Sequence, residues 1–177
     1  MSLRNIFILS FVLFCLCNIG VFSIDSYIKT EVTPLGIISF EFIQTTARAG
    51  QALTAWGTRG QMAVGLSIGL DYLYILLYLI MGFAGFRLIT QKLAVYSRRM
   101  AASVRWLSAL CPLTGLFDLT ENYSLIRILT GSQDAFWPGL AHLCALGKFT
   151  GSILCIALAL MSVLYMVAFF MLRAAKS

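Results

Sequence analysis

Four long apolar runs, separated by three polar stretches, dominate the sequence. A helix needs about 20 apolar residues to cross a bilayer core, and each run approaches or exceeds that length. The pattern predicts an all-α, polytopic integral membrane protein. We expect a single membrane domain, residues 1–177, built as a four-transmembrane-helix bundle with an external amphipathic helix. The predicted spans are residues 6–24, 62–88, 106–128 and 137–172.

The first apolar run, residues 6–24, has two interpretations. It follows Arg4 and is long enough for a retained membrane helix. A cleaved signal peptide would need small residues on either side of its cleavage site, and the string Val21-Phe22-Ser23 fits that requirement poorly. We therefore favour a retained first helix, with cleavage as the alternative.

The stretch 25–61 is too polar to cross a bilayer, but part of it has a helical pattern. After a break at Pro34, apolar residues recur at near-helical spacing from Ile38 to Trp56, opposite polar ones. This predicts an amphipathic helix that lies at the membrane interface, is anchored by Trp56 and ends at Gly57. The helix would cap the outer end of the bundle, and the alternative is a lid over an opening between helices.

Positive charge sets the orientation. The densest group of basic residues falls in the connection 89–105. The positive-inside rule places such a short connection in the cytoplasm. Both termini then also lie on the cytoplasmic side, with Arg173 and Lys176, whereas the stretches 25–61 and 129–136 lie outside. We expect the protein in the plasma membrane, the inner membrane of a bacterium.

Composition narrows the classes of partner. The chain has 60% hydrophobic and 11% charged residues, whereas soluble domains have roughly 25% charged residues. The net charge of +6 comes from basic residues between apolar runs rather than from one solvated face, so we expect no nucleic-acid partner. The five cysteines lie in apolar runs, where a free cysteine behaves as a small hydrophobe, and they indicate no disulfide framework.

Ionisable side chains inside the spans are the strongest indication of a site. A charged residue at the centre of a membrane helix costs about 2.5–3.5 kcal/mol, so it normally faces the bundle interior or a wet cavity. Counted at about 1.5 Å per helical residue, four such residues from three spans share one layer in the outer half of the membrane. They are Asp71, Asp118, Glu121 and Lys148. In this layer we expect Asp71 to pair directly with Lys148.

Small residues and a proline should shape this layer. The second span contains Gly65-x-x-x-Gly69 and the fourth contains Gly147-x-x-x-Gly151 at a matching depth. Such patterns let helix backbones approach closely, so we expect these two spans to pack together there. Pro112 removes a backbone donor from the third span and predicts a bend near it.

We expect a cavity in the outer half of the bundle that binds a lipid or another small amphiphile. Carboxyl and ammonium groups would hold the polar end of that molecule, while membrane lipids surround the helices. The expected ligand-binding residues are Asp71, Tyr74, Asp118, Glu121, Asn122 and Lys148.

Three alternatives remain open for these residues. An intramembrane enzyme would use Glu121 or Asp118 as its general acid or base. An accessory or assembly subunit would pair its charges with a helix of an unidentified protein partner. Finally, the residues could act only as polar contacts that fix the register of the helices.

We expect no metal and no cofactor. His142 is the only histidine, whereas a helical haem site usually takes two axial ligands. The oxygens of Asp118 and Glu121 suit a hard cation, but the neighbouring Lys148 would oppose it.

Two strings within the spans resemble a known family. The strings Gly69-Leu-Asp-Tyr-Leu-Tyr74 and Gly115-Leu-Phe-Asp-Leu-Thr-Glu-Asn122, together with Lys148-Phe149, resemble a family of small four-span bacterial integral membrane proteins. The resemblance covers most of residues 40–165, and its most specific part is the Asp-x-x-Glu-Asn element that begins at Asp118. It implies the four-span architecture and this choice of polar residues, and it implies no activity.

Overall fold

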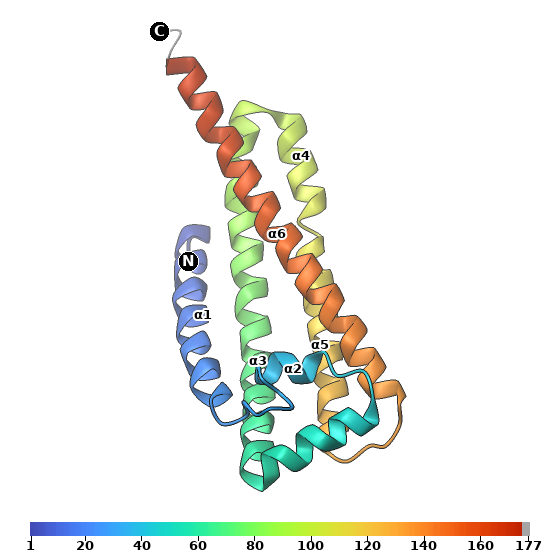
Figure 1. Ribbon diagram of the computed structural model, residues 1–177. Coiled ribbons are helices and arrows are strands. Elements are labelled where there is room, and N and C mark those ends of the chain that lie inside the picture. Colours follow the sequence, from blue (N-terminus) through green and yellow to red (C-terminus); the bar gives the residue numbers. More distant parts are fainter. Residues whose placement is uncertain (175–177) are drawn as a thin grey trace.

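The computed structural model describes residues 1–174, and all regular elements in that part of the chain are helices (Figure 1). They are α1 (Leu3–Asp25), α2 (Ile37–Glu41), α3 (Thr46–Tyr96), α4 (Arg98–Leu107), α5 (Leu110–Leu129) and α6 (Phe136–Ala174). Four stretches are long and apolar enough to cross a membrane: α1, α3, α4 with α5, and α6. The prediction of an all-α chain with four such stretches is confirmed. Lys176 and the side chain of Arg173 lie outside the described residues.

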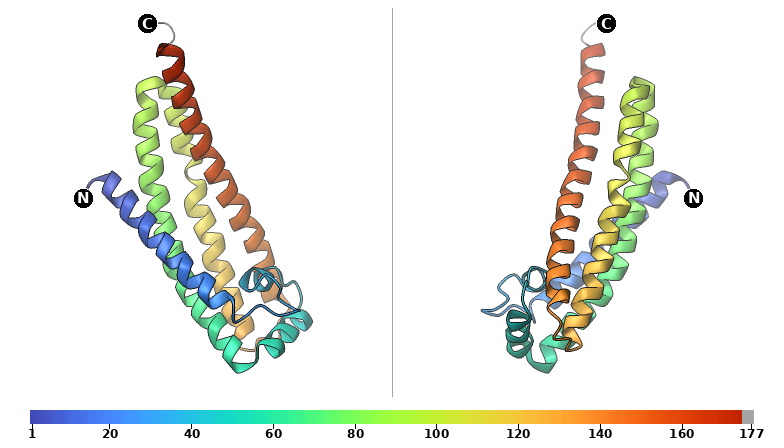
Figure 2. Two further views of the ribbon diagram at one scale, coloured as in Figure 1. Left: turned by 60° about the vertical axis from the view of Figure 1, so that its left-hand side comes forward. Right: turned by 90° about the vertical axis from the view of Figure 1, so that its right-hand side faces the viewer.

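Residues 26–56, here called the cap segment, fold over one end of the bundle, which we call the α2 end (Figures 1 and 2). The prediction of one continuous amphipathic helix in this segment is wrong. The short helix α2 ends at Glu41, and α3 begins separately at Thr46. The reason is Thr45, whose extended backbone stops helix propagation and whose hydroxyl caps the new helix by accepting the N–H of Arg48.

Gly57 ends the first part of α3, as predicted. Its φ of 57° lies in the left-handed region, which glycine adopts without steric cost. The helix changes direction there, and its second part runs the length of the bundle to Tyr96 (Figure 1). The prediction that Trp56 is an interfacial anchor is wrong, because its side chain is 7% exposed. Its indole N–H donates to the carbonyl of Ile28 at 2.7 Å and to the hydroxyl of Thr33 at 3.1 Å, so the polar atom of the buried ring is hydrogen-bonded.

The predicted connection 89–105 is mostly helical, because α3 continues to Tyr96 and α4 follows at Arg98. No glycine or proline occurs in residues 87–96, so nothing stops α3 before Tyr96. Ser97 then adopts an extended conformation, and its hydroxyl accepts the N–H of Met100 to begin α4. The helices α3 and α4 therefore form a hairpin at the end opposite the α2 end (Figure 1).

The third span is interrupted close to Pro112, as predicted. The helix α4 ends at Leu107, and α5 begins at Leu110. Pro112 has no N–H to offer the carbonyl of Ser108, which accepts the N–H of Cys111 at 3.1 Å instead. This tighter turn separates the exposed basic helix α4 from the buried polar face of α5.

The connection between α5 and α6 agrees with the predicted stretch 129–136. Gly131, with a φ of 90°, follows the last turn of α5. The carboxylate of Asp134 accepts the N–H of Phe136 at 2.9 Å and so satisfies a backbone donor at the start of α6.

Two hydrophobic clusters hold the helices together. At the α2 end, Phe40 and Trp56 of the cap segment pack with apolar residues of α3, α5 and α6. At the opposite end, Phe86 and Leu93 of α3 pack with α4 and α6. The polar layer lies between the two clusters. Where such a side chain would otherwise contact water, as in the cap segment, its burial stabilises the fold by about 1.5–3 kcal/mol.

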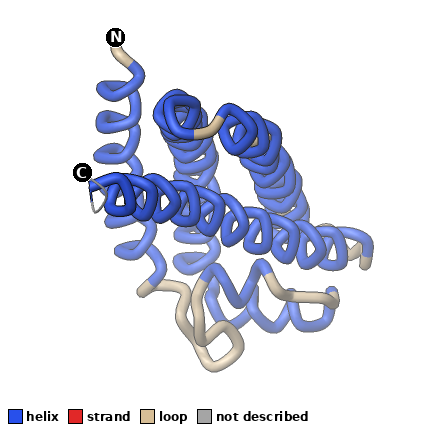
Figure 3. The backbone as a smooth tube through the Cα atoms, turned by 90° about the horizontal axis from the view of Figure 1, so that it is seen from above, coloured by secondary structure: helices blue, strands red, loops and turns tan. Residues whose placement is uncertain are grey.

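The small-residue pattern of α6 packs against α5, so the predicted approach of the second and fourth spans at their glycines is wrong. A Cβ on Gly147 would lie 2.9 Å from the ring of Phe117, and one on Gly151 would collide with Thr114. Nothing lies within 4 Å of a Cβ on Gly69. The helix α6 crosses α3 and α5 obliquely on one side (Figure 3). The helix α1 packs mainly on α3, with its N-terminal end leaning away from the bundle (Figure 2).

Candidate functional site

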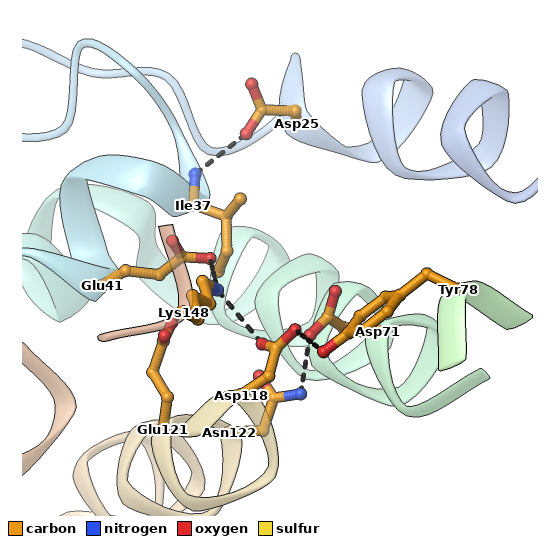
Figure 4. A network of polar contacts seen from close by, with 9 residues as sticks. All are labelled: Asp25, Ile37, Glu41, Asp71, Tyr78, Asp118, Glu121, Asn122 and Lys148. Carbon is orange, nitrogen blue, oxygen red and sulfur yellow. Dashed lines mark hydrogen bonds and ion pairs between the residues drawn. The ribbon is translucent and has the colours of Figure 1, made fainter. Parts of the chain in front are cut away.

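Lys148 of α6 is the centre of a buried charged cluster (Figure 4). Its ammonium nitrogen lies 2.9 Å from a carboxylate oxygen of Glu121, 3.1 Å from one of Glu41 and 3.2 Å from one of Asp118. These four residues are 0–8% exposed. Because removing an ion from water costs several kcal/mol, such charges persist only when they are paired. The cluster therefore ties α2 and α5 to α6 through one side chain.

Helical spacing on α5 aims several polar side chains at its neighbours. Glu121 and Asn122 lie three and four residues after Asp118, so both share a helix face with it, and all three are buried. The amide of Asn122 donates to Asp71 of α3 at 2.7 Å. The phenol of Tyr78, also on α3, donates to the second oxygen of Asp118 at 3.1 Å. The structure thus joins polar residues of α3, α5 and α6 in one layer.

The predicted ion pair between Asp71 and Lys148 does not form. No cation lies within ion-pair distance of Asp71 among the described residues. The ammonium of Lys148 lies among the carboxylates of Glu41, Asp118 and Glu121. Asp71 is bound by Asn122 instead.

Tyr74 lies on the side of α3 that faces α1. Its ring stacks on that of Phe14 with 4.5 Å between centroids and meets Tyr78 edge to face at 5.8 Å. Among the predicted ligand-binding residues it is the one that faces α1.

Glu41 is the member of the cluster that the sequence did not indicate. It lies in the polar stretch 25–61, which was expected to contact water. A carboxylate in water carries no desolvation cost, so the sequence gives no reason to single it out. The carboxylate of Asp25 accepts the N–H of Ile37 at 2.9 Å and so fixes the start of α2, while Phe40 is fully buried. These contacts turn Glu41 inward. Its position between two phenylalanines is the one sign of burial that the sequence carries.

A cavity of about 940 Å³ begins at the charged cluster and continues along the bundle between α1, α3 and α6. Its polar wall consists of Glu41, Asp71, Tyr74, Tyr78, Asp118 and Lys148, with Asn18 and Asp25 of α1. Most other lining residues are apolar and include Phe7, Phe14, Met81, Phe86, Ile156 and Leu160. Arg4 and Lys92 lie at the far end of the cavity. Glu121 and Asn122 are not among the lining residues. They instead bind two residues of the lining, Lys148 and Asp71 respectively.

The charged cluster already contains a cation of the protein itself, the ammonium group of Lys148. In the described part of the chain no group of three or more His, Cys, Asp and Glu side chains is placed to hold a metal ion. The ammonium of Lys148 takes the position among the carboxylates that a metal would need. His142 lies apart from the cluster, with its Nε2 atom 3.3 Å from the amide of Gln44 and its ring against Phe42.

Docking of α2 should depend on pH through Glu41. Burial raises the pKa of Glu41 from 4.5 to about 7, although the nearby Lys148 opposes the shift; Asp71 and Asp118 add to it. Glu41 therefore binds a proton more tightly when α2 is docked than when it is undocked. Docking is favoured at low pH, and this contribution is lost as the pH rises from 4.5 through about 7.

Hydrogen exchange of residues 37–45, corrected for intrinsic rates, measures this effect. The opening equilibrium should increase with pH by up to about ten-fold per unit within that window. Glu41→Gln should remove the dependence, and Glu31→Gln, at an exposed position, should keep it. A pH-dependence that survives in Glu41→Gln would show that another group is responsible.

Comparisons of the chain with protein-family models, with curated proteins and with solved structures find no match. The function proposed below is therefore argued from the geometry of the site.

Proposed function

We propose that this chain is a multi-pass membrane protein that binds a lipid or another small amphiphile in the cavity between α1, α3 and α6. The observation that carries the proposal is the cavity itself, whose volume of about 940 Å³ is near the upper end of the range of about 300–1,000 Å³ for ligand sites. Its long apolar wall suits a hydrocarbon chain, and the charged cluster at one end suits a polar head. Polar contacts that merely fix helix register would not need this space, because protein interiors are otherwise closely packed.

The outer surfaces of the helices support the membrane location. Large apolar side chains face outward along the spans, among them Ile19 of α1 at 63% exposure and Phe170 of α6 at 66%. Apolar surface of this extent is typical of contact with lipid. Arg98 and Arg99 begin α4 at the end opposite α2, so the positive-inside rule places that end in the cytoplasm. In this orientation both termini are cytoplasmic, in the inner membrane of a bacterium, and the charged cluster lies in the outer half.

The two other functions receive less support. Glu121 does not line the cavity, which leaves Asp118 as the enzyme's acid or base, and Asp118 is already bound by Tyr78 and Lys148. An accessory subunit would be expected to turn unpaired charges toward its partner, whereas the charges of the cluster pair within the chain.

Native mass spectrometry of the protein released from nanodiscs tests the proposal. The wild-type protein should retain a defined lipid or amphiphile, and Ala159→Trp, which fills the apolar part of the cavity, should lose it. Ile153→Trp is the matched control, because Ile153 is also on α6 but is 66% exposed and does not line the cavity. Size-exclusion chromatography checks that each variant stays folded. A bare mass for the wild type, or equal retention by the folded Ala159→Trp protein, would overturn the proposal.

A further inference from the structure

We infer that the cavity selects amphiphiles with a cationic head group, either a protonated amine or a quaternary ammonium, and that Asp71 is the counter-ion of that head. This inference rests on the proposed amphiphile-binding function and names the class of ligand.

The first step is the balance of charge around the cavity. At the charged end of the cavity, four carboxyl groups of the described residues lie close to one ammonium group, whereas the lining cations Arg4 and Lys92 are at the far end. The carboxyl groups belong to Glu41, Asp71, Asp118 and Glu121. Lys148 contacts three of them, and Asp71 lies on the cavity wall without a cation beside it. A carboxylate removed from bulk water needs compensation, and a cation that enters the cavity would supply it.

The second step is an unused acceptor atom in the same wall. Glu41 is 7% exposed, and only its Oε1 atom is paired with Lys148. Its buried Oε2 atom has no hydrogen-bond partner in the part of the chain that the structure describes. Buried polar atoms without a partner are rare in native proteins, and Glu121 has a second such oxygen, so the charged cluster holds more acceptor atoms than donors. Glu41 therefore lacks a donor for one oxygen, and Asp71, which accepts a hydrogen bond from Asn122, lacks a cation.

The third step is the aromatic wall beside Asp71. Tyr74 and Tyr78 follow Asp71 by three and seven residues, so the three side chains share one face of α3, and all three line the cavity. Phe14 of α1 stacks on Tyr74 and also lines the cavity. Aromatic faces attract cations by about 0.5–2 kcal/mol, with the larger values in desolvated sites. An anionic head would instead meet Asp71 and Glu41, and its attraction to Lys148 would compete with three carboxylates already in contact.

The experiment compares three ligands that share one hydrocarbon chain: hexadecylamine, hexadecanol and hexadecanoic acid. The full chain in nanodiscs of zwitterionic lipid is titrated with each at neutral pH, and native mass spectrometry counts the bound ligand. The amine should bind at least about ten-fold more tightly than the other two, which corresponds to about 1.4 kcal/mol. Asp71→Asn should abolish this preference, whereas Glu31→Gln at the exposed surface should keep it.

A second pair of variants tests the aromatic wall without touching a charge. Tyr74→Leu should weaken the amine preference, and Tyr74→Phe should retain it, because phenylalanine keeps the aromatic face. These variants also keep the inference testable if Asp71→Asn does not fold.

The outcomes separate the inference from the proposed function. Equal binding of the three ligands would overturn the cationic-head inference and leave amphiphile binding intact. Preference for the acid would overturn it and place the head at Arg4 and Lys92, at the other end of the cavity. Binding of none of the three, by a wild-type protein that also retains no lipid, would overturn both.

Discussion

Replacing Lys148 by methionine is expected to lower the free energy of unfolding by about 3–5 kcal/mol. Methionine keeps the apolar stem of the side chain but removes the ammonium group. Glu41, Asp118 and Glu121 then lose their common counter-ion in a place where each is at most 7% exposed. The loss reflects the cost of leaving these carboxylates buried and unpaired. It is measured by denaturant unfolding of the detergent-purified protein, followed by tryptophan fluorescence.

Lys29→Met is the matched control for this variant. Lys29 pairs with Asp25 at 3.2 Å, but its side chain is 54% exposed, so the expected loss is below about 1 kcal/mol. Adding Glu121→Gln to Lys148→Met should recover part of the larger loss, because it removes one unpaired buried charge. Small and equal losses for the two lysine variants would contradict a buried ion-pair cluster.

Trp56→Ala is expected to cost a further large amount, about 3–5 kcal/mol, through the cap segment. The substitution removes a ring that is 7% exposed and lies 4.9 Å from the ring of Phe40 in an edge-to-face contact. It also removes the indole N–H that binds Ile28 and Thr33. Hydrogen exchange of residues 26–44 should accelerate strongly, and the denaturation midpoint should fall.

Trp106→Ala is the control for this substitution, because Trp106 is 78% exposed. Its effect on stability should stay within about 0.5 kcal/mol, as for other exposed positions. If Trp56→Ala leaves exchange in residues 26–44 unchanged, the indole does not hold the cap segment to the bundle.

The spanning helices could be predicted from the sequence because long apolar runs in a chain of this composition have few alternatives. The bend near Pro112 and the turn at Gly131 could also be predicted, since each depends on the local chemistry of one residue. The end of α3 and the division of the cap segment could not. Each depends on the extended backbone of one residue, Ser97 or Thr45. A serine or threonine in a sequence does not by itself indicate that conformation.

The charged residues of the layer could be found because a carboxylate or ammonium in an apolar run is costly and therefore conspicuous. The pairing could not be predicted, because it depends on how each helix is rotated about its axis. Asp71 and Lys148 are at similar depth, yet Asn122 binds the first and three other carboxylates bind the second. Glu41 could not be predicted for the opposite reason. A charged residue is common in a polar stretch, and only the tertiary contacts show that this one is buried.

The ion pair between Glu41 and Lys148, at 3.1 Å, joins a surface segment to the inside of the bundle. Under the proposed function, a head group that interacted with Glu41 would change the stability of α2 docking. By thermodynamic reciprocity, a change in docking alters the affinity for that head group by the same factor. Under the proposed function, the docking of the cap segment would therefore report whether the cavity is occupied.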